Sequence, residues 1–174
     1  TQIKLASDYG FNVTVESHNW AQLKKRRDAY IKRLNTIYER NLNKRGIHII
    51  RGSAEFKNST TITVDNIDYT AKKTVISTGG RPIIPALEGS NHGTDSDGFF
   101  SLSECPSRVA IIGSGYIAVE FAGLLSALGS EVSLLIRKES LLRSFDGMLS
   151  ENLKKALIHQ EVKIIEKVIP NSLD

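Results

Sequence analysis

Apolar side chains between Asn19 and Gly46 recur at intervals of three and four residues. This period predicts an amphipathic helix from about residue 19 to residue 43, with one buried stripe. Asn19 can cap the start of this helix, and Gly46 can end it. The stripe consists of Trp20, Leu23, Tyr30, Ile31, Leu34, Ile37, Tyr38 and Leu42.

The period then shortens, and four segments rich in Ile, Val and Thr predict a small set of strands. These segments are residues 47–51, 61–64, 69–71 and 74–77. Asp65-Asn66 supplies turn chemistry between two of them. Residues 79–106 follow, with three prolines and five glycines, and this composition predicts a loop-like crossing between domains.

Strands and helices alternate in the last third of the chain. We expect strands at residues 109–112, 131–136 and 162–165, joined by helices at 116–128 and 149–159. Parallel strands connected by helices predict an α/β fold with a doubly wound, Rossmann-like sheet. The chain therefore divides into two expected domains, residues 1–105 with a small antiparallel β element and residues 106–174 with the parallel sheet.

Composition narrows the class of protein. The chain has 174 residues, of which 40% are hydrophobic, and no apolar run approaches the roughly 20 residues of a membrane-spanning helix. Its single cysteine, Cys105, excludes an internal disulfide framework. The chain begins at Thr1 and shows no signal peptide. We therefore expect a cytoplasmic protein without a membrane partner, and a piece of a longer chain.

The net charge of +4 is unevenly distributed. The segment from Lys24 to Arg51 contains ten basic residues and only two acidic ones, Asp28 and Glu39. This segment therefore has a net charge of +8, and the rest of the chain has a net charge of −4. A nucleic-acid groove is one interpretation of the run at residues 24–27. No RNA- or DNA-binding motif accompanies it, so we favour the solvated face of an amphipathic helix and expect no nucleic-acid partner.

Residues 113–118 match the dinucleotide motif G-x-G-x-x-G/A between a predicted strand and a predicted helix. Gly113 permits the tight turn, Gly115 lets the backbone approach a pyrophosphate, and the small Ala118 allows close packing of helix on strand. The amides at the helix start then face the phosphates. The alternative is a glycine turn without a ligand. The predicted cofactor-binding residues here are Gly113, Ser114, Gly115, Tyr116, Ile117 and Ala118.

The end of the second strand of this sheet indicates which dinucleotide binds. NAD sites place Asp or Glu there, about 20 residues after the glycines, to hold the ribose 2′-hydroxyl. This chain has Arg137 and Lys138 instead, with Arg143 close behind. Cationic side chains suit a 2′-phosphate, so the sequence predicts NADPH rather than NADH. The alternative is that these are solvated loop charges.

Glu120 lies four residues after Tyr116 on the same predicted helix, so the two side chains share a face. On a helix that starts at the dinucleotide phosphates, this face can look toward the nicotinamide. A simple surface pair on the helix explains the spacing equally well.

The chain resembles the glutathione reductases, a branch of the flavin-dependent pyridine nucleotide–disulfide oxidoreductases, along nearly its whole length. Two segments, residues 96–100 (Ser-Asp-Gly-Phe-Phe) and 143–146 (Arg-Ser-Phe-Asp), favour this branch over dihydrolipoamide dehydrogenase, trypanothione reductase and thioredoxin reductase. The other matching segments are residues 8–11, 27–30, 37–38, 49–52, 77–82 and 115–120.

The resemblance implies roles for individual residues. It places Ser114, Ile117 and Glu120 along the NADPH site, and Arg137 and Arg143 at the 2′-phosphate. Tyr116 is similar to the side chain that covers the nicotinamide pocket and moves aside when NADPH enters. Residues 1–105 then correspond to the end of an FAD-binding segment, and residues 106–174 to the first half of an NADPH domain.

The resemblance also implies FAD and substrate contacts in the first part of the chain. Ala54 would touch the adenine end of FAD through its backbone, and Thr78 and Gly79 match a turn beside the FAD. Tyr38 is similar to the tyrosine that contacts glutathione disulfide, although the pattern alone makes it a core aromatic. The whole protein would be a homodimer that reduces glutathione disulfide with NADPH.

Other parts of the family pattern are absent from this sequence. It has neither the N-terminal glycine motif for FAD nor the C-x-x-x-x-C redox pair, and Cys105 lies in a different place. None of the four histidines lies in a matching motif, so no catalytic residue and no metal site are assigned. We therefore expect the chain alone to be inactive. A sister disulfide reductase of the trypanothione or thioredoxin type, or a non-catalytic NADP-binding module, remains an alternative.

Overall fold

The computed structural model describes residues 2–173, without the side chains of Gln2 and Lys4. The chain forms two compact units, Leu23–Arg81 and the residues on either side of that segment. No helix among the described residues combines the length and the apolar character needed to cross a membrane.

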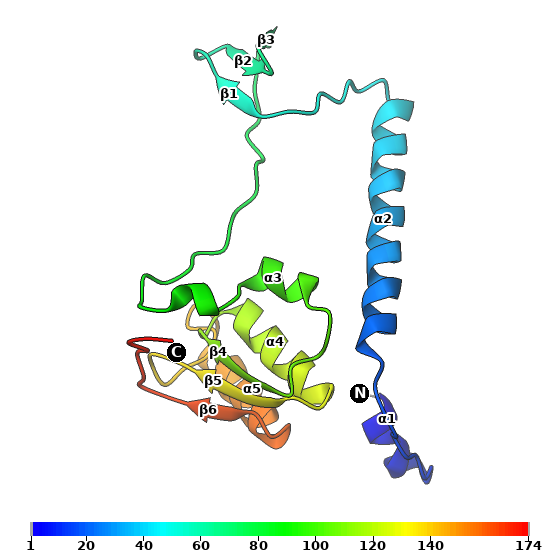
Figure 1. Ribbon diagram of the computed structural model, residues 1–174, viewed down its shortest axis with the longest axis vertical. Helices are drawn as coiled ribbons and strands as arrows, with labels where there is room; N and C mark the ends of the chain where they lie inside the picture. The colour runs from blue at the N-terminus through cyan, green and yellow to red at the C-terminus, as the bar shows by residue number, and fades with distance from the viewer. Residues whose placement is uncertain (1, 174) are drawn as a thin grey trace. The chain divides into compact units, whose positions relative to one another are not determined.

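The larger unit contains a three-stranded parallel sheet in the order β4-β5-β6 (Figure 1). Its strands are Arg108–Ile112, Glu131–Leu135 and Lys163–Ile165, and the helices α4 (Tyr116–Ala127) and α5 (Gly147–His159) connect them. The alternation of strands and helices predicted from the sequence is thus confirmed. In the register, Leu135 is paired with both Ile112 and Ile165, so the three strands end at one level.

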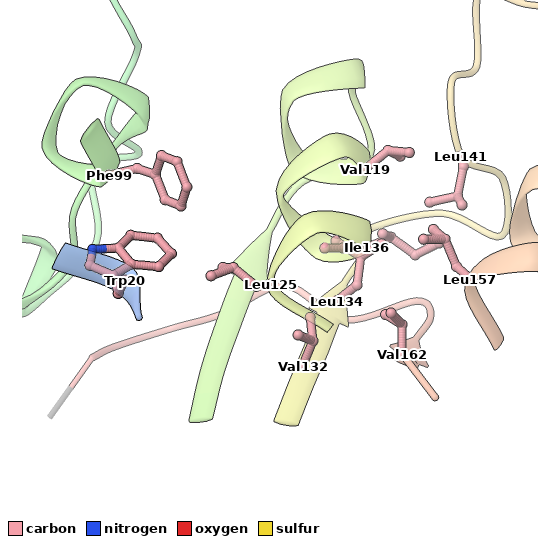
Figure 2. Packing of buried hydrophobic residues seen from close by; sticks show 11 residues of the cluster. Trp20, Phe99, Val119, Leu125, Val132, Leu134, Ile136, Leu141, Leu157 and Val162 are labelled. Carbon is pink, nitrogen blue, oxygen red and sulfur yellow. The ribbon is translucent and has the colours of Figure 1, made fainter. Parts of the chain in front are cut away.

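The core of this unit lies between the sheet and its helices. Val132, Leu134 and Ile136 alternate along β5 and its extension, so their side chains share one face and are almost completely buried. Figure 2 shows these side chains together with those of α4 and α5. Burial of each such side chain stabilises the fold by about 1.5–3 kcal/mol. The cluster also includes Val119, Ala122, Leu125, Leu141, Leu157 and Val162.

A second group of contacts joins the start of α2 to a short helix, α3 (Ser96–Ser101). The indole Nε1 of Trp20 donates a hydrogen bond to the carbonyl of Leu102 at 3.0 Å. The rings of Trp20 and Phe99 are edge-on, with 5.9 Å between their centroids. The Phe99 ring stacks on that of Phe121 in α4, with 4.1 Å between the centroids. These aromatic contacts attach the residues around Trp20 to the parallel-sheet unit.

Helix α3 differs from the sequence prediction of a continuous loop over residues 79–106. It forms because the Asp95 side chain accepts hydrogen bonds from the amides of Asp97 and Gly98, and because Phe99 is buried. A further 3₁₀ turn, η2, spans Ser90–His92. At the N-terminus, α1 (Gln2–Leu5) is followed by η1 (Ala6–Tyr9).

The smaller unit contains most of helix α2 (Trp20–Lys44) and an antiparallel sheet in the order β1-β2-β3. The strands are Ala54–Phe56, Thr61–Val64 and Ile67–Thr70. Asp65 and Asn66 connect β2 and β3, and both have positive φ angles of 48° and 66°. Such angles are typical of a type I′ hairpin turn, so the turn predicted here is confirmed.

Several predictions for this smaller unit are wrong. Residues 47–51 and 74–77 form no strand, and β1 lies in a segment where none was expected. Of the predicted helix stripe only Trp20 is buried, whereas Leu23, Tyr30 and Tyr38 are exposed. Strands need hydrogen-bonding partners and apolar stripes need apolar neighbours, and the described residues of this unit supply neither to these segments.

Candidate nucleotide-binding site

The turn between β4 and α4 has the backbone conformation that the glycine motif predicts. Gly113 has a φ angle of 141°, which L-residues with a side chain rarely adopt. Its amide donates a hydrogen bond to the carbonyl of Leu135 at 3.0 Å, which ties the turn to the end of β5. A Cβ atom on Gly113 would lie 3.5 Å from that of Ala118. A small residue at position 118 therefore lets the helix pack closely on the turn.

The start of α4 forms an open cradle. Gly115 is its N-cap residue, and no side chain among the described residues caps the helix. Apart from the neighbouring residues in the chain, no described heavy atom lies within 4 Å of a Cβ built on this glycine. The first-turn amides of Tyr116, Ile117 and Ala118 have no acceptor within the helix. These amides and the positive end of the helix dipole suit a pyrophosphate, and a side chain at position 115 would fill the space it needs.

The cationic loop, defined here as residues 137–143, starts where β5 ends. Ile136, directly before the loop, and Leu141, within it, are completely buried. Arg137, Lys138 and Arg143 are exposed. The amide of Leu142 donates a hydrogen bond to the carbonyl of Ser114 at 2.8 Å. This bond places the cationic loop against the glycine-rich turn. The structure thus brings together the residues predicted to bind pyrophosphate and 2′-phosphate.

An acidic side chain in the same loop is paired with a lysine. Glu139 forms an ion pair with Lys167. The hydrogen bond from Lys167 holds the pKa of Glu139 below its ordinary value, and the same bond raises the pKa of Lys167. The negative charge of Glu139 is therefore compensated by Lys167, and the cations of the loop keep their attraction for an anion.

Tyr116 and Glu120 share a face of α4, as the four-residue spacing predicts. Both side chains are exposed, Tyr116 to 63%. Within the part of the chain that the structure describes, no hydrogen bond joins them or covers this face. The geometry is compatible with a nicotinamide on this side of the helix and equally with a surface pair.

The residues predicted for FAD and glutathione lie in three separate segments of the smaller unit. Ala54 is in β1, paired with Val64. Thr78 and Gly79 follow in a segment without helix or strand, and Tyr38 is 62% exposed on α2. Among the described residues, no strand pairing or backbone hydrogen bond joins these three segments to one another.

Sequence reasoning missed the residues that hold the cationic loop in place. Leu142 has a φ angle of 46°, unusual for leucine, and Ser150 on α5 donates a hydrogen bond to the carbonyl of Leu141. Nothing in the local pattern marks either residue. Asp146 could have been found, because an Asp before a helix is a typical cap, and its side chain accepts a hydrogen bond from the amide of Met148.

Comparisons with known proteins show the family to which the chain belongs. Residues 5–171 match the family model described as "Pyridine nucleotide-disulphide oxidoreductase". The glutathione reductase of Schizosaccharomyces pombe is 44% identical over 171 residues, covering 94% of this chain and 37% of that protein. The glutathione reductase of Yarrowia lipolytica is 38% identical over 95% of this chain and 38% of its own length.

The chain is also similar in structure to a solved flavoprotein disulfide reductase. The HOCl-induced flavoprotein disulfide reductase RclA from Escherichia coli superimposes with a TM-score of 0.82 at 28% identity, covering 90% of this chain and 37% of that one. The chain thus spans somewhat more than a third of the length of the relatives it matches. The family match covers most of the chain, which therefore belongs to the pyridine nucleotide–disulphide oxidoreductases, with glutathione reductases among its relatives.

Proposed function

We propose that the chain is a segment of a flavin-dependent glutathione-disulfide reductase, which converts NADPH, a proton and glutathione disulfide into NADP⁺ and two glutathione molecules. The identity of 38–44% to two glutathione reductases over almost the whole chain supports this substrate. The segment binds NADPH and contributes part of the FAD and glutathione sites. We place the whole protein in the cytoplasm as a homodimer.

One observation carries the NADPH part of the proposal. The hydrogen bond from the Leu142 amide to the Ser114 carbonyl joins the cradle at the start of α4 to the cationic loop. An adenine dinucleotide whose pyrophosphate lies on the cradle would then have its ribose 2′-position near Arg137, Lys138 and Arg143. A phosphate there gains charge-assisted hydrogen bonds that a hydroxyl does not.

In this proposal the chain binds and orients, and the bound flavin and a dithiol elsewhere in the protein supply the redox chemistry. Amides of the first turn of α4 hold the pyrophosphate, and the cationic loop selects the phosphorylated ribose. Tyr116 covers the nicotinamide pocket. On the grounds of the family resemblance, Ala54, Thr78 and Gly79 contact FAD, and Tyr38 contacts glutathione disulfide.

The test is a steady-state assay of the full-length reductase that carries this segment, loaded with FAD. NADPH oxidation is followed at 340 nm with glutathione disulfide as the acceptor, and NADH serves as the control donor. We expect turnover with NADPH and at least tenfold lower kcat/KM with NADH. Equal use of both donors would overturn the cofactor assignment, and activity confined to another disulfide would overturn the substrate.

A second candidate is a sister disulfide reductase. It is favoured by the TM-score of 0.82 to a bacterial flavoprotein disulfide reductase that is described as induced by HOCl. The same assay separates the two candidates when trypanothione disulfide and oxidised thioredoxin are offered beside glutathione disulfide. A non-catalytic NADP-binding module would bind NADPH and reduce none of them.

A further inference from the structure

We infer that Ser150, on helix α5 and outside the glycine motif, is a positioning residue for the cationic loop and thereby sets the preference for a 2′-phosphorylated nucleotide. This inference rests on the proposed binding of NADPH at the loop. Ser150 would touch no nucleotide atom. It acts through one peptide group of the loop.

The hydroxyl of Ser150 donates a hydrogen bond to the carbonyl of Leu141 at 2.6 Å. Ser150 is only 7% exposed, and the Leu141 side chain is completely buried in the core. The backbone amide of Ser150 donates in turn to the carbonyl of Asp146, the N-cap residue of α5. The serine is therefore fixed in the first turns of a helix that packs on the sheet.

The carbonyl of Leu141 and the amide of Leu142 belong to the same planar peptide group. Ser150 holds the oxygen of this group, and the carbonyl of Ser114 holds its hydrogen. The group is thus clamped between α5 and the glycine-rich turn. Its orientation determines where the chain goes next, which is to Arg143.

The backbone at this point needs such a clamp. Leu142 has a φ angle of 46°, and a left-handed conformation is unfavourable for a leucine. The amide of Phe145 donates to the carbonyl of Leu142 at 2.7 Å, which extends the ordered turn past Arg143. Without the Ser150 hydroxyl, a buried carbonyl loses its partner, and rotation of the peptide group relieves both the lost hydrogen bond and the unfavourable φ angle.

Loss of the clamp should affect nucleotides with a 2′-phosphate selectively. The cradle at the start of α4 is built by Gly113 and Gly115 and does not depend on Ser150. The pyrophosphate is common to NADP⁺ and NAD⁺, so its contacts stay. Only the contacts of Arg143 and its neighbours with the 2′-phosphate are weakened.

The experiment uses Ser150→Ala in the oxidised full-length flavoprotein, with the Kd of NADP⁺ and of NAD⁺ measured by calorimetric titration. We expect the Kd of NADP⁺ to rise about five- to tenfold, the effect of one buried hydrogen bond. The Kd of NAD⁺ should change by less than twofold. A change of equal size for both nucleotides, or none, would overturn the inference.

Ser130 provides a matched control. Its hydroxyl donates to the carbonyl of Pro106 at 2.6 Å and it is 8% exposed, almost the same values as for Ser150. It lies directly before β5, at the opposite end of that strand from the cationic loop. Ser130→Ala should lower Tm as Ser150→Ala does and leave the ratio of the two Kd values unchanged. An equal shift of that ratio in both variants would contradict a positioning role.

A second pair of variants keeps the test decisive if Ser150→Ala lowers Tm too far. Ser150→Cys has a side chain of similar size but only a weak donor, so it should retain the Tm and lose the preference for NADP⁺ over NAD⁺. Ser150→Thr keeps the hydroxyl and should keep this preference. Wild-type selectivity in Ser150→Cys would overturn the inference. If the wild-type protein itself does not prefer NADP⁺, the proposed function fails, and this outcome is separate from a failure of the Ser150 inference.

Discussion

Ser114 and Ser150 bind opposite ends of one peptide group, the carbonyl of Leu141 and the amide of Leu142. Ser114 does so with its backbone carbonyl from the glycine-rich turn, and Ser150 with its side chain from α5. This peptide group is therefore held from two sides, by the glycine-rich turn and by α5.

Removal of the two arginines should abolish the preference for NADPH. Each charge-assisted hydrogen bond to a phosphate contributes about 1.5–3 kcal/mol. In the double variant Arg137→Ala, Arg143→Ala we expect kcat/KM for NADPH to fall at least 30-fold, about 2 kcal/mol, and that for NADH to stay within twofold. Arg108→Ala, at the exposed amino end of β4, is the control and should change neither value.

The two glycines of the turn should respond differently to substitution. Gly115 has φ −81° and ψ 173°, which any residue adopts, and the space around it is open. Gly115→Val should therefore keep its Tm and weaken NADPH and NADH alike by at least tenfold, because the side chain enters the cradle. A retained affinity for both nucleotides would argue against a pyrophosphate at this place.

Gly113→Ala should instead destabilise the fold. Its φ angle of 141° is strained for alanine, and such strain costs about 1–3 kcal/mol. We expect a lower denaturation midpoint for this variant than for Gly115→Ala. Urea unfolding of both variants in parallel measures the difference, and equal midpoints would contradict the conformational argument.

The ion pair between Glu139 and Lys167 should make the stability of the loop sensitive to acid. The folded pKa of Glu139 lies below its unfolded value because Lys167 donates to it. The contribution of the ion pair to folding stability is therefore complete above the pKa that Glu139 has in the unfolded chain. It is lost as the pH falls through the pKa that Glu139 has in the folded protein. The Tm difference between the wild type and Glu139→Gln should shrink toward zero below about pH 4.

Salt provides the control for this pH effect. Both groups are solvent-exposed, so 1 M NaCl should reduce the same Tm difference at pH 7. Glu139 raises the pKa of Lys167 in the folded protein. The corresponding stabilisation is complete below the pKa of an unfolded-chain lysine and is lost only as the pH rises through the folded pKa, in the alkaline range. A Tm difference that is constant from pH 3 to 7 and insensitive to salt would refute the role of the pair.

Trp20 should stabilise the parallel-sheet unit in two separable ways. Trp20→Phe removes the hydrogen bond to the carbonyl of Leu102 and should cost about 1 kcal/mol. Trp20→Ala also removes the contact with Phe99 and should cost about 3–5 kcal/mol. Chemical denaturation of the three proteins tests this order. Equal costs for both variants would mean that the aromatic contact adds nothing.

The 174-residue chain alone should not reduce glutathione disulfide. Its one cysteine, Cys105, cannot form an internal dithiol. The Cys105 sulfur lies 3.4 Å from the hydroxyl of Ser130, away from the cationic loop. NADPH-dependent release of thiol, followed with a chromogenic disulfide reagent, should stay at the level of the blank. Thiol production above the blank would refute the expectation that the chemistry needs groups elsewhere in the protein.

Local patterns were sufficient for the parallel sheet and its glycine turn. The strand ending at Ile112, the turn at Gly113 and the helix starting at Tyr116 were all predicted from the sequence, because hydrophobic period and glycine placement act over a few residues. Asp65-Asn66 was likewise predicted as a turn. The pairing of the strands and the position of Arg137 beside the turn followed from the rules of α/β topology.

Other features depended on partners distant in sequence. Residues 47–51 have strand-like composition and form no strand, since that composition becomes a strand only where another strand accepts its hydrogen bonds. Tyr30 and Tyr38 match a buried stripe and remain exposed, because burial requires a neighbour that the stripe itself does not specify.

The sequence by itself determined the order of the elements, the glycine turn and the cationic character of the loop, because these follow from local conformational preference and charge. Only the tertiary structure decided how the loop is held. The peptide group between Leu141 and Leu142 is oriented by Ser114 and Ser150, which the chain brings together only after β5 and α5 have packed. Hydrogen bonds between segments leave no periodic signal in the sequence, and so this contact had to be seen in the fold.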